Sequence, residues 1–275
     1  MKIDLIIPSF ERGRSLALTL LSVRRMSPRP EKIWVLDQSK SIDPEILSIC
    51  GGSGEFICLF CFSIPGAQYA RNWAAKESSA DILLFLDDDV DPEPRLVEAH
   101  LENYRDPTIH AVAGFYLEPG ESETSQPKDG IWWRPLTQLE RYPASYSKRV
   151  DSPLWPSCNG SIRREVLQKA GYRCVHDPKA RLFHRKEPTG GNRPVKPGDR
   201  VIANREKWYT WFYFFWMNYG LLGLGEILLR MRTNVFRRPY LMNPKLLLIA
   251  VAEMGAGLAM AVGVMFKGRK LMGKG

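Results

Sequence analysis

Short apolar runs alternate with helix-like stretches through residues 1–115, and this alternation restricts the fold more than any other feature. The apolar runs have the length of buried strands and cover residues 3–8, 32–36, 56–62, 82–86 and 110–115. The stretches between them have helical spacing or helix-start residues and cover residues 15–25, a short segment opened by Asp43-Pro44, residues 66–78, and a segment from Asp91-Pro92 to about Tyr104. This order predicts an α/β fold with a mostly parallel sheet and helices on both faces.

Carboxylates stand at the ends of two of these runs. Asp37 follows the second run, and Asp87, Asp88 and Asp89 follow the fourth. Ligands of open α/β sheets bind at the carboxyl ends of the strands. Side chains alternate along a strand, so Asp87 and Asp89 are expected on one side, where they can hold a divalent cation, Mg²⁺ or Mn²⁺. Helix capping is the alternative and accounts for Asp91, but three successive carboxylates repel one another without a cation.

Charge and cysteine content narrow the class of partner. The formal net charge is +9, and the basic residues concentrate in the C-terminal half. This predicts a phosphorylated substrate or anionic lipid as partner. Nucleic acid is not expected, because the basic residues accompany an apolar tail and not a recognisable reading helix. The five scattered cysteines do not form a disulfide framework, which favours a reducing compartment.

The last quarter of the chain has a different character. A Gly-, Pro- and Lys/Arg-rich stretch at 187–200 predicts a boundary, with a nucleotide-binding domain over 1–195 and a membrane-associated helical tail over 196–275. Residues 208–225 carry no charge and many aromatic side chains, and residues 246–266 carry only Glu253. Twenty-one helical residues reach about 30 Å, the thickness of the hydrocarbon core.

The charges between the two apolar segments bear on their topology. These charges are Arg230, Arg232, Arg237, Arg238 and Lys245. If both segments crossed the membrane, this basic loop would lie outside, against the positive-inside rule. We therefore expect the first segment in the interface, the loop on anionic lipid, and the domain at the cytoplasmic face of the membrane. Whether the second segment spans is left open, and the alternative is that both are core helices.

Four motifs in order resemble family 2 glycosyltransferases, which have the GT-A fold. They are IIPSFERGRSL at 6–16, VLDQS at 35–39, GAQYARNWAAKES at 66–78 and ILLFLDDDV at 82–90. The resemblance covers about residues 3–193. It implies a metal-dependent, inverting transfer of a sugar from a nucleotide-sugar donor to a saccharide or lipid-linked acceptor, as in polysaccharide synthesis.

The resemblance also implies roles for individual residues. The donor-binding residues that it implies are Pro8, Ser9, Glu11, Asp37, Arg71, Asp87 and Asp88, with Arg12 as an alternative to Glu11 against the base or ribose. For Asp37 the alternative is turn chemistry with Gln38 and Ser39. For Arg71 the alternative is an exposed helix arginine.

Further matches concern the metal and the acceptor. The segment WPSCNGSIRR at 155–164 resembles the acceptor-side strand and turn and assigns Trp155 and Asn159 there. Residues 172–184 resemble the segment that closes the domain, which makes His184 a third metal ligand beside Asp87 and Asp89; a structural histidine is the alternative. The basic residues from 184 to 193 either close over a diphosphate or form a solvated linker.

The chain departs from the family at the catalytic base. Only 18 positions separate Asn159 from Asp177, and Glu165 is the sole acid between them, so the helix that usually carries the base is missing. The candidate substitutes are Glu165, Asp177 and Glu187. The second hypothesis is therefore a catalytically silent, membrane-associated protein that binds nucleotide-sugar without turnover.

Overall fold

The computed structural model describes residues 1–52, 56–61, 67–125, 144–152, 156–166, 173–188, 208–209, 212, 227–228, 231–232, 235–236 and 241–272. The chain divides into two compact units. The first comprises Met1–Asp129 and Glu140–Pro197, and the second comprises Gly130–Leu139 and Gly198–Gly275.

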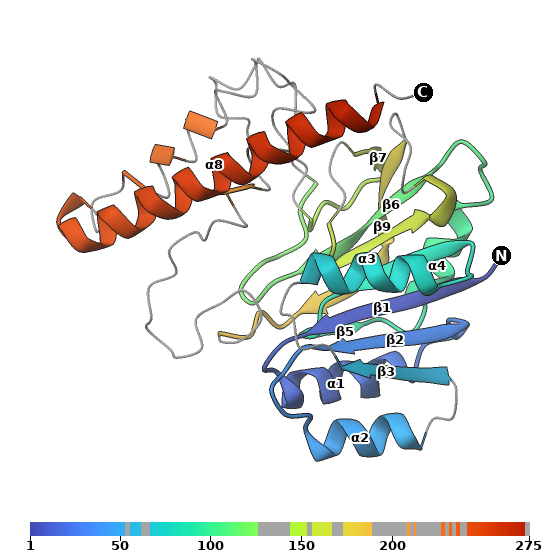
Figure 1. Cartoon of the computed structure of the whole chain (residues 1–275). Coiled ribbons are helices and arrows are strands. Elements are labelled where there is room, and N and C mark those ends of the chain that lie inside the picture. The colour runs from blue at the N-terminus through green and yellow to red at the C-terminus, as the bar shows by residue number, and fades with distance from the viewer. Residues whose placement is uncertain are drawn as a thin grey trace. The chain divides into compact units, whose positions relative to one another are not determined.

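A mixed sheet forms the centre of the first unit (Figure 1). Its described strands are β1 (Ile3–Ser9), β2 (Lys32–Asp37), β3 (Ile57–Cys61), β4 (Ile82–Leu86), β5 (Val90–Pro92), β6 (Ala111–Leu117), β7 (Val150–Asp151), β8 (Asn159–Arg163) and β9 (Cys174–His184). Their order is β3-β2-β1-β4-β8-β6-β9-β5, and β7 pairs with β9. Strands β1, β2, β3, β4, β6 and β9 share one direction, and the others run against them, which confirms the mostly parallel sheet.

Helices cover both faces of this sheet, as predicted. The described helices of the first unit are α1 (Gly13–Val23), α2 (Pro44–Gly51), α3 (Ala67–Glu77) and α4 (Leu96–Asn103). Alternation along β1 explains the two layers, because successive side chains point to opposite faces. Leu5 packs in one core with Leu16 of α1, whereas Ile6 packs in the other core with Ala70 of α3.

The helix predicted from Asp91-Pro92 to about Tyr104 is present, but its predicted start is wrong. Residues Val90–Pro92 instead form β5, which pairs antiparallel with the end of β9, and α4 begins only at Leu96. Pairing with residues ninety or more positions away outweighs the local Asp-Pro signal, since tertiary context overrides local propensity. The pairing sets Val90 opposite His184. It thereby brings the acidic turn beside the last residue of β9.

The described part of the second unit contains one long apolar helix, α8 (Pro244–Met272). Its segment Pro244–Gly263 has a mean hydropathy of 2.0. Among the described residues, this is the one helical segment that is long and apolar enough to cross a membrane. This confirms the predicted C-terminal apolar helix. Within the unit, Ala250 and Ala261 pack with Trp208 and Phe212. Most of residues 208–225, expected in the membrane interface, lie outside the described residues.

Candidate metal and donor-binding site

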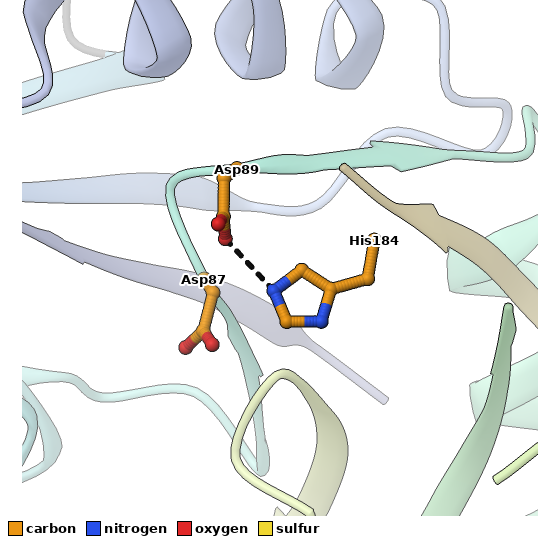
Figure 2. A group of neighbouring side chains, drawn as sticks. All are labelled: Asp87, Asp89 and His184. Carbon is orange, nitrogen blue, oxygen red and sulfur yellow. Dashed lines mark hydrogen bonds and ion pairs between the residues drawn. The ribbon is translucent and has the colours of Figure 1, made fainter. Parts of the chain in front are cut away.

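Three potential metal ligands meet at the carboxyl end of β4 (Figure 2). Asp87 follows Leu86, the last residue of β4; Asp89 precedes β5; and His184 ends β9. Each offers one ligand atom, and the three atoms lie within 4.8 Å of one another. The β5–β9 pairing brings the histidine to the aspartates, so this cluster depends on a contact that the strand pattern alone did not contain.

Asp89 is the most tightly held member of this cluster. It is fully buried, its Oδ1 lies 3.0 Å from His184 Nε2, and its Oδ2 accepts a hydrogen bond of 3.0 Å from the Glu187 backbone N–H. Arg12 Nη1 lies 3.2 Å from the same Oδ2. Burial raises the pKa of Asp89, but the contacts with His184, Arg12 and the Glu187 N–H outweigh burial and lower that pKa to about 2. Asp89 is therefore a carboxylate at neutral pH.

Asp88 turns into the protein interior. It is buried, and its carboxylate accepts hydrogen bonds from Ser9 Oγ at 2.7 Å and from Arg12 Nη1 at 2.8 Å. Burial raises the pKa of Asp88, against the opposing effects of Arg12 and Ser9. Ser9 and Asp88, both predicted at the donor, thus bond to each other beneath the cluster. The guanidinium of Arg12, the alternative to Glu11 against the base or ribose, contacts Asp88 and Asp89.

Arg71 and Asp87 form a partly exposed pair at the edge of the cluster. Arg71 Nη2 donates to Asp87 Oδ1 over 2.7 Å, and the Asp87 side chain is 31% exposed. The exposed helix arginine considered for Arg71 does not fit this burial, because its side chain is only 14% exposed. Helix α3 therefore places the positively charged Arg71 beside Asp87, the partly exposed carboxylate of the Asp87–Asp89–His184 cluster.

Asp37 and Glu11 are joined through Ser39 at the ends of β1 and β2. Asp37 Oδ1 accepts hydrogen bonds from the backbone N–H and the hydroxyl of Ser39. Ser39 Oγ in turn accepts from the Glu11 backbone N–H at 2.7 Å. The turn chemistry foreseen for Asp37 is thus present. Glu11 is exposed and has a φ of 54°, and Pro8 beside it is buried.

A hollow of about 450 Å³ opens beside Glu11. Its lining residues are Glu11, Arg12, Gly13, Arg14, Ser15, Leu18 and Glu187. The hollow extends from Glu11 to Glu187. Since the Glu187 backbone N–H bonds to Asp89, the hollow reaches the Asp87–Asp89–His184 cluster.

The side chains of Arg185 and Lys186, which follow His184, both bond to other residues of the protein. Arg185 donates to Val90 O at 2.7 Å, Ser15 O at 2.9 Å and Thr19 Oγ1 at 2.8 Å. Lys186 pairs with Glu118, the residue that follows β6. The structure thus shows both side chains bonded to the protein, and residues 190–193 of the same basic stretch lie outside the described residues. Sequence reasoning missed Glu118, although an acid directly after a core strand is the signal that identified Asp37 and Asp87.

Asn159, predicted on the acceptor side, has no exposed atom. Its Nδ2 donates to Phe115 O at 2.9 Å and to Ala180 O at 2.8 Å, and its Oδ1 lies 3.0 Å from His100 Nε2. The side chain thus joins β6, β9 and α4 and is not available to an acceptor. Trp155, the other acceptor-side residue, lies outside the described residues.

The three candidate bases occupy very different places. Glu165 comes two residues after Arg163, which pairs with Ile82 at the start of β4, so Glu165 lies at the end of the strands opposite to Asp87. Asp177 is buried, and its carboxylate accepts from Asn103 Nδ2 at 2.5 Å and from the Lys179 N–H at 2.9 Å. Of these three acids, Glu187 alone contacts the Asp87–Asp89–His184 cluster, through its backbone N–H, and its carboxylate lies 3.4 Å from Ser15 Oγ.

Comparisons with known proteins agree with this architecture. The sequence profile of glycosyl transferase family 2 matches residues 4–171. The mannosyltransferase PcManGT from Pyrobaculum calidifontis, solved with GDP-Man and Mn²⁺, superposes with a TM-score of 0.52 at 17% identity, covering 98% of this chain and 80% of that one. GalNAc-T7, solved with UDP, GalNAc and Mn²⁺, gives a TM-score of 0.55 at 15% identity, covering 79% of this chain and 49% of that one. No curated protein sequence matches significantly. At these identities the two structures show a shared fold.

Proposed function

The chain belongs to glycosyl transferase family 2 and has the GT-A fold, and from this we propose that it moves a sugar from a nucleoside diphosphate sugar to a saccharide or lipid-linked acceptor, with inversion and with a divalent cation. The observation that carries the proposal is the convergence of Asp87, Asp89 and His184 at the carboxyl end of β4.

The residues of this cluster fit a divalent cation. Two carboxylates and one imidazole suit Mn²⁺, and the carboxylates also suit Mg²⁺. Asp89 is ionised at neutral pH, and Asp87 is open to a ligand. A bound cation would neutralise charge on the leaving diphosphate. The two solved relatives were determined with Mn²⁺, which supports the same cation here.

We assign the donor to the surface that runs from Asp37 to Asp87. Glu11 would face the nucleoside, and the buried Asp37 would support it through Ser39. Arg71 and Asp87 would lie toward the ribose and the cation. Pro8, Ser9 and Asp88 support this surface from beneath, since all three are buried. The relatives bind GDP-Man and UDP respectively, so a nucleoside diphosphate is the common ligand.

Glu187 is the residue that we assign as catalytic base. It is the one predicted acid at the cluster, and an inverting displacement needs a group that removes the acceptor proton. The burial of Asp177 and the distant position of Glu165 favour, as the second candidate function, a protein that binds nucleotide-sugar without turnover. Transfer assays on the wild type distinguish the two.

We further propose that residues 1–195 act as the catalytic domain and that residues 196–275 hold it at the cytoplasmic face of a membrane. Only 17% of an 18-residue window of the segment Pro244–Gly263 is buried, and large apolar side chains such as Leu248 and Leu258 are exposed. An apolar helix of this length matches the hydrocarbon thickness.

Calorimetric titration tests the donor and metal sites. The protein is titrated with UDP, GDP and dTDP, with and without Mn²⁺, beside the variants Asp89→Asn and Asp91→Asn. Asp91 is a matched control, because it lies two residues away and is 49% exposed. We expect metal-dependent binding of one nucleotide by the wild type and by Asp91→Asn, lost in Asp89→Asn. Folded protein that binds no nucleotide would overturn the proposal.

A further inference from the structure

We propose that Glu118 is a positioning residue for the metal site, acting through His184. This inference rests on the proposed function of the Asp87–Asp89–His184 cluster. It adds a fourth residue to that site, from the end of β6, which supplies none of the three ligands.

The ring of His184 has one satisfied and one unsatisfied nitrogen. Nε2 faces the cluster and lies 3.0 Å from Asp89 Oδ1, as Figure 2 shows. Nδ1 is buried and has no hydrogen-bond partner among the described residues. Tyr116 packs edge-on against the ring, with centroids 5.9 Å apart at 83°. A buried polar atom without a partner is costly, so Nδ1 calls for an acceptor or donor nearby.

Glu118 supplies an acceptor at this position. Strands β6 and β9 are parallel neighbours with Leu117 opposite Phe183, so the residue that follows β6 lies across from the last residue of β9. Glu118 Oε1 is 3.7 Å from His184 Nδ1, and Glu118 Oε2 pairs with Lys186. The gap to Nδ1 exceeds a hydrogen bond by about 0.7 Å. A small movement of the side chain closes it.

Metal ligation would make this contact necessary. A neutral imidazole carries one proton, and the nitrogen that ligates a cation must offer a lone pair. With Nε2 turned to the cation, the proton resides on Nδ1 and needs an acceptor, which is the position of Glu118 Oε1. A carboxylate that receives this proton orients the ring and strengthens the ligand. Glu118 therefore raises the affinity of the site for its cation without touching it.

The affinity of the full-length protein for Mn²⁺ tests this role. Free Mn²⁺ is measured by electron paramagnetic resonance in the presence of the nucleotide that binds, for the wild type, Glu118→Ala, Glu118→Gln and His184→Ala. We expect Glu118→Ala to weaken Mn²⁺ binding by about 10- to 100-fold. Glu118→Gln keeps an acceptor oxygen and should lose less. Glu123→Ala, which removes an exposed carboxylate from the same loop, should leave the affinity unchanged.

A double variant separates this role from a general structural one. In the His184→Ala background, Glu118→Ala should cost no further affinity, because the residue that it positions is gone. An unchanged affinity in the single variant, or a full additional loss in the double variant, would overturn the inference. Thermal unfolding of each variant confirms that the protein is folded.

The same experiment distinguishes this inference from the proposed function. A wild type that binds no Mn²⁺ with any nucleotide would sink the proposed metal site and this inference with it. If the wild type binds Mn²⁺ and Glu118→Ala binds it equally tightly, the inference about Glu118 is overturned and the proposed metal site is not. The ¹⁴N hyperfine coupling of bound Mn²⁺ should be present in the wild type and absent in His184→Ala; its absence from the wild type would contradict ligation by His184.

Discussion

Arg12 and Asp88 form a buried ion pair that joins the loop after β1 to the turn after β4. Arg12 Nη1 lies 2.8 Å from Asp88 Oδ1, and the two side chains are 9% and 5% exposed. The pair lies beneath the metal cluster and is linked to it, since the same guanidinium nitrogen contacts Asp89. Arg12 thus balances the charge of two carboxylates that the chain brings together.

Loss of this guanidinium should destabilise the fold. Arg12→Met keeps much of the stem but leaves Asp88 buried without its cation, and breaking a buried pair in this way costs about 3–5 kcal/mol. Urea unfolding followed by circular dichroism measures the change. Lys2→Ala is the control, because it removes an exposed pair with Glu31 and should leave the midpoint unchanged. Equal midpoints for the two variants would contradict the prediction.

The pH dependence of stability should reflect His100. This side chain is fully buried between Asn159 and Ser161, and burial lowers the pKa of His100 to about 4, with Asn159 and Asp177 opposing the shift. Below about pH 6.5 His100 is protonated in the unfolded chain but stays neutral in the folded protein. The contribution of neutral His100 to the free energy of unfolding is therefore fully present above about pH 6.5 and is lost as the pH falls toward about 4. About 2 kcal/mol is lost between about pH 7.5 and pH 5.

His100→Gln tests this contribution. The variant removes the titrating group, so its free energy of unfolding should change less with pH than that of the wild type over the same range. Urea titrations at pH 5, 6, 7 and 7.5 give both curves. The same pH dependence in the two proteins would rule out His100 as the source.

Turnover should depend on Glu187 and not on Glu165. If Glu187 removes the acceptor proton, Glu187→Gln lowers kcat by about 10²- to 10⁴-fold. Nucleotide affinity should be nearly unchanged, because the backbone N–H of residue 187 still bonds Asp89. Glu165→Gln, at the opposite edge of the sheet, should keep wild-type turnover. Steady-state kinetics with donor and acceptor decide this, and an active Glu187→Gln would exclude Glu187 as the base.

Membrane association should depend on the apolar surface of α8. Leu258 is 45% exposed inside the segment Pro244–Gly263, and a lysine there is unfavourable in the hydrocarbon core. Leu258→Lys should reduce the fraction of protein that co-sediments with anionic phospholipid vesicles. Leu47→Lys, at a leucine that is 51% exposed in α2, should co-sediment like the wild type. If Leu258→Lys also co-sediments fully, α8 is not the membrane contact.

Local pattern in the sequence was enough for much of the sheet. The run at 82–86 coincides with β4, and the run at 32–36 with β2 to within one residue. The Asp43-Pro44 start of α2 is also confirmed, with Asp43 accepting from the Glu45 N–H. These features depend on side-chain period and on contacts between near neighbours, which a single sequence displays directly.

Direction and depth of the site side chains were harder to predict. Strand alternation placed Asp87 and Asp89 together, and the structure does bring them together, but the chain turns after Leu86 and sends Asp88 into the core. The acid candidates show the same limit. The Asp177 carboxylate accepts a hydrogen bond from Asn103 in the interior. Glu165 lies just past the end of β8, and because β8 runs antiparallel to β4, this is the end of β4 away from Asp87.

The sequence by itself determined the order of the elements, the family, and the acids at the ends of β2 and β4. The elements and the acids follow from spacing along the chain, and the family follows from the resemblance of four motifs. Only the tertiary structure decided which partners those acids have: His184 reaches Asp89 across 95 positions, and Arg12 reaches Asp88 across 76. The first contact arises from the pairing of β9 with β5, and the second from the pairing of β1 with β4. Hydrogen-bond partners contributed by distant strands leave no periodic signal in the local sequence.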